Sequence, residues 1–249
     1  MQFLKSLEVR LRRARNQLTP FIYAGDARFC PCCQKSFSRF LPAGSKQRRR
    51  DDAVCPYCRS RERDRLLILL FEQEATLLKG SPRILHFAPE PAVQGYLKVQ
   101  SLSLYHTTDL MRNDVSFKAD IQALELGDGS YDGVICAHVL QDVPSEEAAV
   151  SEVYRILSAG GWAIFSVPVR GETTIQNSGP ENERSAWDAR PDEHIRQYGT
   201  DFSERLVQSG FSVTVLAPQD LLTDAATIER HGLSNETFTN VVFVARKPG

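Results

Sequence analysis

Two CxxC pairs constrain this chain more than any other feature: Cys30 with Cys33, and Cys55 with Cys58. Two thiolates three residues apart on a tight turn can face one ion, and a second such turn completes a tetrahedral sulfur site of the kind that holds Zn²⁺. The stretch around them has few large apolar side chains, so a metal would have to supply much of its folding free energy. The pattern predicts a small module that is stabilised by a structural zinc ion and is followed by a larger domain.

A pair of disulfides is the alternative interpretation of these four cysteines. Paired CxxC turns and the lack of an export signal favour the metal. Cys32, inside the first turn, is a spare thiol that could replace a neighbour as ligand. Cys136 lies in an apolar stretch and is expected to be a buried hydrophobic residue.

The length of 249 residues allows one good-sized domain and an appendage. No apolar run approaches the ~20 residues that a membrane-spanning helix needs. The basic N-terminus lacks the uninterrupted apolar stretch that is typical of a secretory signal. Together with cysteines expected to be reduced, these features indicate the cytoplasm. The sequence does not indicate an oligomeric state.

The net charge of −1 hides a strong asymmetry. Residues 1–70 carry 16 Lys and Arg against 6 Asp and Glu, whereas residues 71–249 carry 14 against 25. A basic head of this kind can bind a polyanion such as RNA, or an anionic membrane surface. The alternative is that these charges pair with the acidic body or face water, and the sequence leaves both open.

Four parts follow one another along the chain. Apolar residues at helical spacing with arginines between them predict a basic amphipathic helix within residues 1–22. The zinc-ribbon module spans residues 23–60, and residues 61–80 are expected to form a helix, apolar all round, that bridges to a domain of residues 81–249. In this last part strands alternate with helices, which predicts an α/β fold with a doubly wound parallel sheet. Strands are expected at 83–88, 104–110, 131–139, 162–168, 211–216 and 241–246.

Ligands bind such sheets at the carboxyl ends of the strands, so the residues that follow each strand are candidates. Asp109 is placed to accept hydrogen bonds from a ribose diol. Asp120 could take the amino group of an adenine while Ile121 covers its face. His138 follows the long central strand. Each has a structural alternative, because the two aspartates could cap turns and His138 could be a buried core histidine.

The stretch LELGDGSYDGVICAHVLQDVP, followed by AVSEVYRILSAGGWAIFSVP, resembles the class I S-adenosylmethionine-dependent methyltransferases of the type 11 kind. The segments CPCC, CPYCRSRERDRL, ILHFAPEP and DEHIRQYGTDFSERLVQSGF are similar to a subset of that family with an N-terminal zinc ribbon. The resemblance implies a Rossmann-like, seven-stranded methyltransferase sheet with S-adenosylmethionine as cofactor.

The family's first loop is an acidic residue followed by GxGxG, where glycine lets the backbone approach the cofactor. Here His86 replaces the acid, and Ala88, Glu90 and Ala92 occupy the glycine positions. We therefore expect His86, Ala88 and Glu90 to form the cofactor loop, with Glu90 bonded to the cofactor's amino group. Asp142 stands where the family often has histidine, so the sequence assigns it no role.

Methyl transfer from a sulfonium requires donor and nucleophile to be held in line about 3–3.5 Å apart, and a base only if the nucleophile must lose a proton. His194 is the best candidate for that base, because imidazole titrates near neutral pH; the alternative is a surface residue at a helix start. His138 is the second catalytic candidate. Arg196 is a candidate partner for a substrate phosphate or carboxylate. Other polar groups that could shape the acceptor site are Glu172, Asp192 and Tyr198.

The sequence thus predicts an S-adenosylmethionine-dependent methyltransferase that acts on a small-molecule or carbohydrate-linked acceptor. One alternative is an RNA methyltransferase that binds its substrate through the basic head. A second is a non-catalytic binding protein that retains the fold. No motif encodes the acceptor or the acceptor atom.

Overall fold

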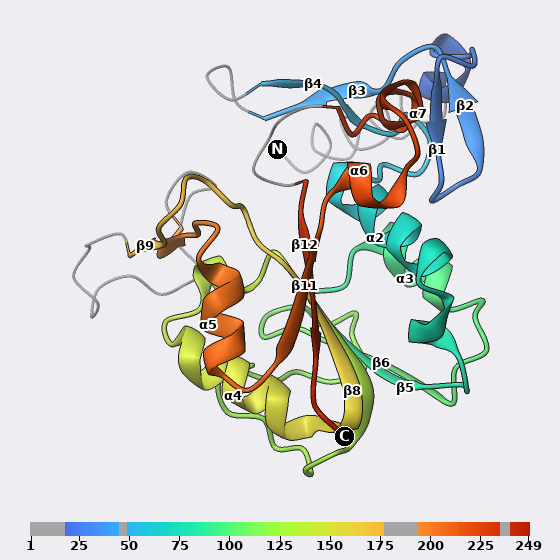
Figure 1. The fold of residues 1–249 in the computed structure, drawn as a ribbon. Coiled ribbons are helices and arrows are strands. Elements are labelled where there is room, and N and C mark those ends of the chain that lie inside the picture. The colour runs from blue at the N-terminus through green and yellow to red at the C-terminus, as the bar shows by residue number, and fades with distance from the viewer. Residues whose placement is uncertain (1–17, 45–48, 177–193, 235–239) are drawn as a thin grey trace, which may run out of the picture.

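The computed structural model describes residues 18–44, 49–176, 194–234 and 240–249. A six-stranded sheet lies at the centre, and the cysteine-bearing module sits beyond one end of it (Figure 1). Most of the predicted basic helix lies outside the described residues, although residues 18–22 are helical. Within the described ranges, no helix combines the length and apolar character needed to cross a bilayer.

The strands of the central sheet stand in the order β11-β12-β8-β7-β5-β6. β6, β5, β7 and β8 run parallel, whereas β12 is antiparallel to both β8 and β11. The order reverses between β5 and β7, so their carboxyl ends flank a topological switch point. The bounds are β5 Arg83–Phe87, β6 Leu104–Thr108, β7 Tyr131–Ala137, β8 Leu157–Ser166, β11 Ser212–Leu216 and β12 Val242–Arg246.

Two expectations about this sheet need correction. β12 is antiparallel, so the sheet is mixed, and the described residues hold six strands rather than the seven that the resemblance implies. Beyond β6, the described residues form only an isolated parallel bridge between Thr108 and Phe117. Next to this bridge, the Ser116 hydroxyl accepts the N–H of Thr107 at 3.1 Å, and the Ser116 N–H donates to the Thr107 carbonyl at 2.9 Å. These hydrogen bonds pair both backbone groups of one residue of the edge strand.

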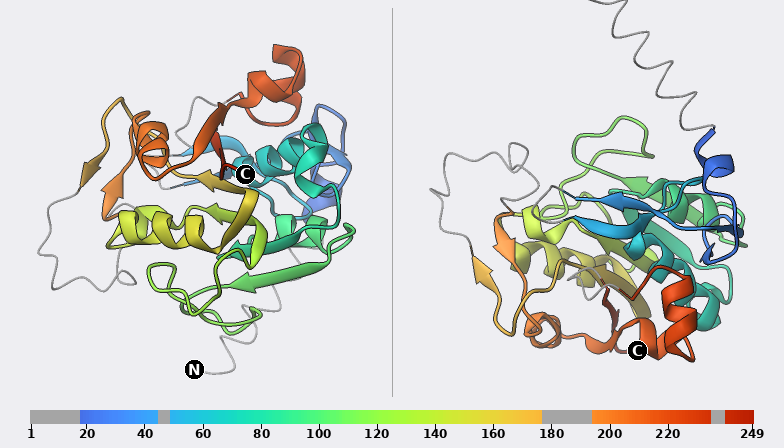
Figure 2. Two further views of the ribbon diagram at one scale, coloured as in Figure 1. Left: turned by 60° about the horizontal axis from the view of Figure 1, so that its bottom comes forward. Right: turned by 90° about the horizontal axis from the view of Figure 1, so that it is seen from above.

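Helices cover both faces of the sheet (Figure 2). α4 and α5 pack on one face, and α2 and α3 pack on the other. α4 begins where the Ser145 hydroxyl accepts the N–H of Ala148, as expected of an N-cap. The helical bounds are α2 Glu62–Gln73, η2 Ala75–Leu78, α3 Pro91–Leu97, η3 Leu140–Asp142, α4 Glu146–Ile156, α5 Phe202–Gln208, α6 Pro218–Leu221 and α7 Ala225–Arg230.

The interior of α2 is apolar on every side, and its residues 66–71 are buried, as the sequence predicted. It shares a core with Trp162, whose indole N–H donates to the carbonyl of Leu77 at 3.1 Å. Gly133 in β7 has to be glycine, because a Cβ there would collide with the Trp162 ring. α2 therefore covers one face of the sheet. The proposed boundaries between the four parts remain a prediction.

Short antiparallel pairs complete the structure. β1 (Arg28–Cys30) pairs with β2 (Lys35–Phe37), and β3 (Leu41–Ala43) pairs with β4 (Arg50–Val54). The first CxxC turn joins β1 to β2, and the second directly follows β4. A third pair, β9 (Ile175–Gln176) with β10 (Arg196–Gln197), lies on the opposite side of the molecule from β1 and β2 (Figure 1).

Candidate cofactor cavity and metal centre

A cavity of about 360 Å³ opens at the carboxyl ends of β5, β6 and β7. It lies where the strand order reverses, the place at which open α/β sheets bind ligands. It brings together five of the residues predicted to contact the cofactor: Ala88, Asp109, Asp120, Ile121 and His138. The cavity is also lined by residues that had no predicted role: Phe87, Leu110, Ala119, Gln122, Val139, Asp142, Val143 and Pro144.

Two lining residues adopt left-handed backbone conformations. Ala88 has φ 45° and His138 has φ 54°, and each directly follows a strand of the switch point. Such a conformation costs a non-glycine residue on the order of 1–3 kcal/mol and is concentrated at functional sites. Ala88 occupies a glycine position of the resembling family and adopts the backbone conformation that glycine permits there. The glycine-free loop therefore retains a glycine-like turn.

Asp109 and Asp120 cap turns and also line the cavity. One carboxylate oxygen of Asp109 accepts the N–H groups of Met111 at 2.8 Å and Arg112 at 2.9 Å. One oxygen of Asp120 accepts the N–H of Gln122 at 2.9 Å. The structural alternative is therefore correct for both residues, but it does not exclude a ligand role. Oδ2 of Asp109 makes no hydrogen bond to the described part of the chain.

His86 and Glu90 are not among the cavity-lining residues. They form a buried pair, with His86 Nε2 3.1 Å from a Glu90 oxygen, while His86 Nδ1 lies 2.9 Å from the Tyr105 hydroxyl. Glu90 also lies 3.5 Å from the Arg63 guanidinium. Burial and the nearby charge of Glu90 raise the pKa of Asp64 to about 6. His86 and Glu90 stand on either side of Ala88 in the sequence. Their contact with the cofactor remains a prediction.

His138 presents a buried polar atom without a partner. Its Nε2 makes no hydrogen bond within the described residues. Burial, and then the positive charge of Arg63, hold the pKa of His138 well below its usual value of 6.5, so the ring is neutral at pH 7. A neutral imidazole does not repel a cationic ligand. An unsatisfied nitrogen beside a cavity, two carboxylates and an apolar wall form a set of groups that fits S-adenosylmethionine.

His194 is paired with Asp142, a relationship that no local pattern reveals because 52 residues separate them. Nδ1 of His194 lies 2.8 Å from a carboxylate oxygen of Asp142. Because a carboxylate only accepts hydrogen bonds, Nδ1 carries the proton and Nε2 of the neutral ring is an acceptor. The second oxygen of Asp142 accepts from the side-chain amide of Gln141 at 2.9 Å. The pair has the arrangement of a histidine base oriented by a carboxylate.

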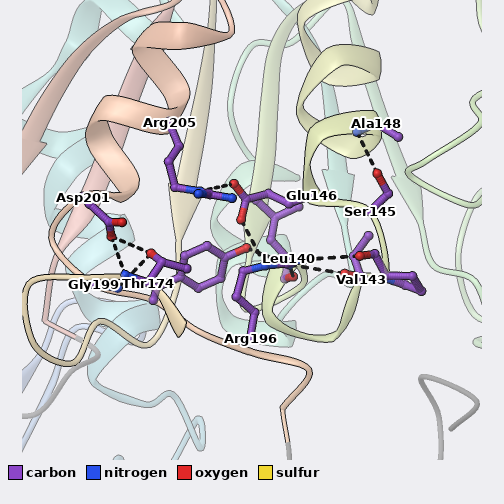
Figure 3. A network of polar contacts seen from close by, with 12 residues as sticks. Leu140, Val143, Ser145, Glu146, Ala148, Thr174, Arg196, Gly199, Asp201 and Arg205 are labelled. Carbon is purple, nitrogen blue, oxygen red and sulfur yellow. Dashed lines mark hydrogen bonds and ion pairs between the residues drawn. The ribbon is translucent and has the colours of Figure 1, made fainter. Parts of the chain in front are cut away.

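The predicted role of Arg196 as a partner of a substrate anion is wrong. Its side chain is 4% exposed, and its guanidinium donates to backbone carbonyls, among them those of Leu140 and Val143 (Figure 3). Tyr198 is buried as well, and Glu172 is exposed. Asp192 lies outside the described residues.

The four CxxC cysteines converge on one point. Their sulfur atoms all lie within 4.8 Å of one another, with Cys30 Sγ 3.6 Å from Cys58 Sγ and Cys33 Sγ 3.8 Å from Cys55 Sγ. Zinc at about 2.3 Å from each of four tetrahedral sulfurs would place those sulfurs about 3.8 Å apart. All six cysteines are free, so the disulfide alternative is wrong. Cys32 lies outside this set of four, and Cys136 is buried as expected.

Residues 100–165 match the model of a family described as a methyltransferase domain. The match contains β6, β7, α4 and most of β8, and with them Asp109, Asp120, Ile121, His138 and Asp142. The loop with His86, Ala88 and Glu90 precedes the matched segment. No curated protein matches the chain.

Solved structures share the fold of this chain. An S-adenosylmethionine-dependent methyltransferase from Mesorhizobium loti is 18% identical with a TM-score of 0.51, over 72% of this chain and 98% of that one. Burkholderia thailandensis 1,6-didemethyltoxoflavin-N1-methyltransferase is 14% identical with a TM-score of 0.50, over 73% and 79%. Haemonchus contortus phosphoethanolamine N-methyltransferase 2 is 14% identical with a TM-score of 0.51, over 75% and 53%. The fold is therefore that of the S-adenosylmethionine-dependent methyltransferases.

Proposed function

We propose that the chain is an S-adenosylmethionine-dependent methyltransferase that binds its cofactor in the cavity at the ends of β5, β6 and β7. The observation that carries this proposal is that five residues from three segments of the chain, each predicted to contact cofactor, line one cavity of about 360 Å³. Asp109 accepts hydrogen bonds from the ribose, Asp120 accepts one from the adenine amino group, and Ile121 covers the ring. Glu90 is held by His86 and does not line the cavity, so we assign it no contact with the cofactor.

When bound, S-adenosylmethionine supplies an electrophilic methyl group on a sulfonium. His194 Nε2 takes the proton of an acceptor whose nucleophile must lose one. Asp142 fixes the orientation of the ring through Nδ1 and stabilises the positive charge that the ring gains. His138 stays neutral and contributes a hydrogen-bonding nitrogen at the cavity wall.

We assign the acceptor to the small molecules, including small groups linked to carbohydrate. Two structural neighbours with TM-scores of 0.50 and 0.51 are methyltransferases named for small molecules. The RNA alternative has less support, because two arginines of the described part of the basic head are paired with carboxylates. Arg28 pairs with Asp52 at 3.0 Å, and Arg50 pairs with Glu62 at 2.9 Å.

We further propose that Cys30, Cys33, Cys55 and Cys58 hold one structural zinc ion. Four thiolates would complete the coordination of a structural zinc ion, which would leave no open position for catalysis. When bound, the metal supplies folding free energy to a module whose apolar core consists chiefly of Phe37 and Phe40 besides the cysteines.

Calorimetric titration of the full chain with S-adenosylhomocysteine tests the proposal. We expect saturable one-to-one binding, and we expect labelled methyl from S-adenosylmethionine to appear on one compound of a panel of small amine and hydroxyl acceptors. Absence of binding at millimolar ligand would disprove the cofactor site. Binding without transfer to any acceptor would instead favour the non-catalytic alternative, and transfer only to RNA, lost steeply with salt, would favour the RNA enzyme.

A further inference from the structure

The guanidinium of Arg196 holds the loop that carries Asp142. One terminal nitrogen donates to the carbonyls of Leu140 at 3.2 Å and Val143 at 3.3 Å, and the other donates to the carbonyl of Pro144 at 3.2 Å (Figure 3). These carbonyls precede and follow Asp142 in the sequence. A single planar side chain therefore fixes the backbone on both sides of the carboxylate that contacts His194.

The same residue anchors the segment that carries His194. Arg196 lies two residues after His194 in β10, whose backbone pairs with β9 at Gln176. The hydrogen bond between Asp142 and His194 joins two segments that are 52 residues apart in the sequence. The hydrogen bond from Arg196 to Leu140 joins the same two segments. Its position thus determines where both members of the pair stand.

Arg196 is fully committed to these contacts. Its side chain is 4% exposed, and Glu146, which is also buried, lies 3.4 Å away. Glu146 in turn accepts a hydrogen bond from Arg205 at 2.7 Å, and the two arginines approach it from different sides (Figure 3). A buried guanidinium is stable only with such partners. Because its side chain is buried, Arg196 can act on the reaction only through other residues.

We propose that Arg196 is a positioning residue, which sets the hydrogen bond between Asp142 and His194 and thereby directs His194 Nε2 toward the acceptor. The role of His194 as a base rests on the proposed function. The effect of Arg196 on the hydrogen bond between Asp142 and His194 can be tested without methyl transfer.

The test observes the Nδ1–H proton of His194 by NMR in the full chain with S-adenosylhomocysteine added. His194→Gln identifies the signal by removing it. We expect Arg196→Lys to abolish or broaden the signal, because an ammonium group lacks the planar fork that reaches three carbonyls. Arg205→Lys is the matched control, since Arg205 shares Glu146 but contacts none of the three carbonyls, and we expect it to leave the signal unchanged. A wild-type signal that persists unaltered in Arg196→Lys would overturn the proposal.

Glu146→Gln replaces Arg196→Lys if the latter lacks a cooperative thermal transition. It keeps the guanidinium but removes the charge that orients it, so we expect a weaker signal, and an unchanged one would overturn the proposal.

Once an acceptor is known, we expect Arg196→Lys to lower kcat about 10- to 100-fold, with KM for S-adenosylmethionine unchanged. This loss should vanish in an Asp142→Asn background, and an equal loss in both backgrounds would show that Arg196 does not act through Asp142. A wild-type chain that transfers no methyl would contradict the proposed function. The NMR signal tests separately whether Arg196 positions the hydrogen bond between Asp142 and His194.

Discussion

The guanidinium of Arg65 donates to the backbone carbonyl of His231 at 2.7 Å, although 166 residues separate them in the sequence. Arg65 is completely buried, and it also donates to the carbonyls of Gly232 and Ala53 at 3.0 Å and of Ser60 at 3.2 Å. One side chain of α2 thereby joins the cysteine module to the segment that follows α7. The module is packed against the part of the chain that holds the central sheet, rather than tethered to it.

Replacing Arg65 should destabilise the whole chain. A lysine has three donors on a point charge, so Arg65→Lys leaves several buried carbonyls unsatisfied, and we expect the free energy of unfolding to fall by about 2–4 kcal/mol. Urea denaturation at pH 7.5 measures this change. Arg49→Lys, at a side chain that is 62% exposed, is the matched control and should change little. Equal stabilities of the two variants would contradict the role of Arg65.

Zinc should be required for the module to fold. We expect elemental analysis to find about one zinc ion per chain and a strong chelator to lower Tm. Cys55→Ser should lower both the zinc content and Tm, because a hydroxyl is a poor zinc ligand. Cys32→Ser is the control, since Cys32 lies outside the four converging sulfurs. If Cys32→Ser were as damaging as Cys55→Ser, the assigned ligand set would be wrong.

Asp109→Asn isolates the charge of the proposed ribose acceptor. The amide oxygen can still accept the N–H groups of Met111 and Arg112, so the turn is retained. Loss of charge-assisted hydrogen bonds should weaken S-adenosylhomocysteine binding about 10- to 100-fold by calorimetry. Asp114→Asn removes an exposed carboxylate that does not line the cavity, and we expect unchanged affinity. Equal affinities of Asp109→Asn and wild type would exclude a ribose contact.

His138 should make stability depend on pH. Its pKa is lowered in the folded state, so below its ordinary value of 6.5 the unfolded chain binds a proton that the folded chain does not. Stability from this residue is therefore complete above that value and is lost as pH falls through it. We expect wild type to lose stability relative to His138→Asn between about pH 7.5 and 5.5, measured by urea denaturation at each pH. Parallel curves for the two proteins would contradict a neutral buried His138.

Ala88→Gly should relieve backbone strain in the cofactor loop. At φ 45° a glycine has no steric penalty, although it costs more entropy on folding. We expect a net gain of about 0.5–1 kcal/mol in the free energy of unfolding. Ala92→Gly, in the first turn of α3, is the control and should destabilise slightly instead. A destabilised Ala88→Gly would show that the left-handed turn stores no strain.

Much of the fold is encoded locally and was therefore predictable. The alternation of apolar strands with amphipathic helices predicted all six strands of the sheet, and the CxxC spacing predicted the four cysteines that converge. The resemblance implied a seventh strand, but the described residues form only an isolated bridge beside β6, and no local pattern marked this difference.

For the site, the sequence by itself determined which residues end each strand, because strand ends follow from local pattern and parallel strands bring their carboxyl ends to one edge. That reasoning placed Asp109, Asp120 and His138 around one cavity. Only the tertiary structure decided that His194 meets Asp142 and that Arg196 is buried rather than available to a substrate. These contacts join segments about 50 residues apart, and no periodicity or motif in either segment records the partner that packing brings to it.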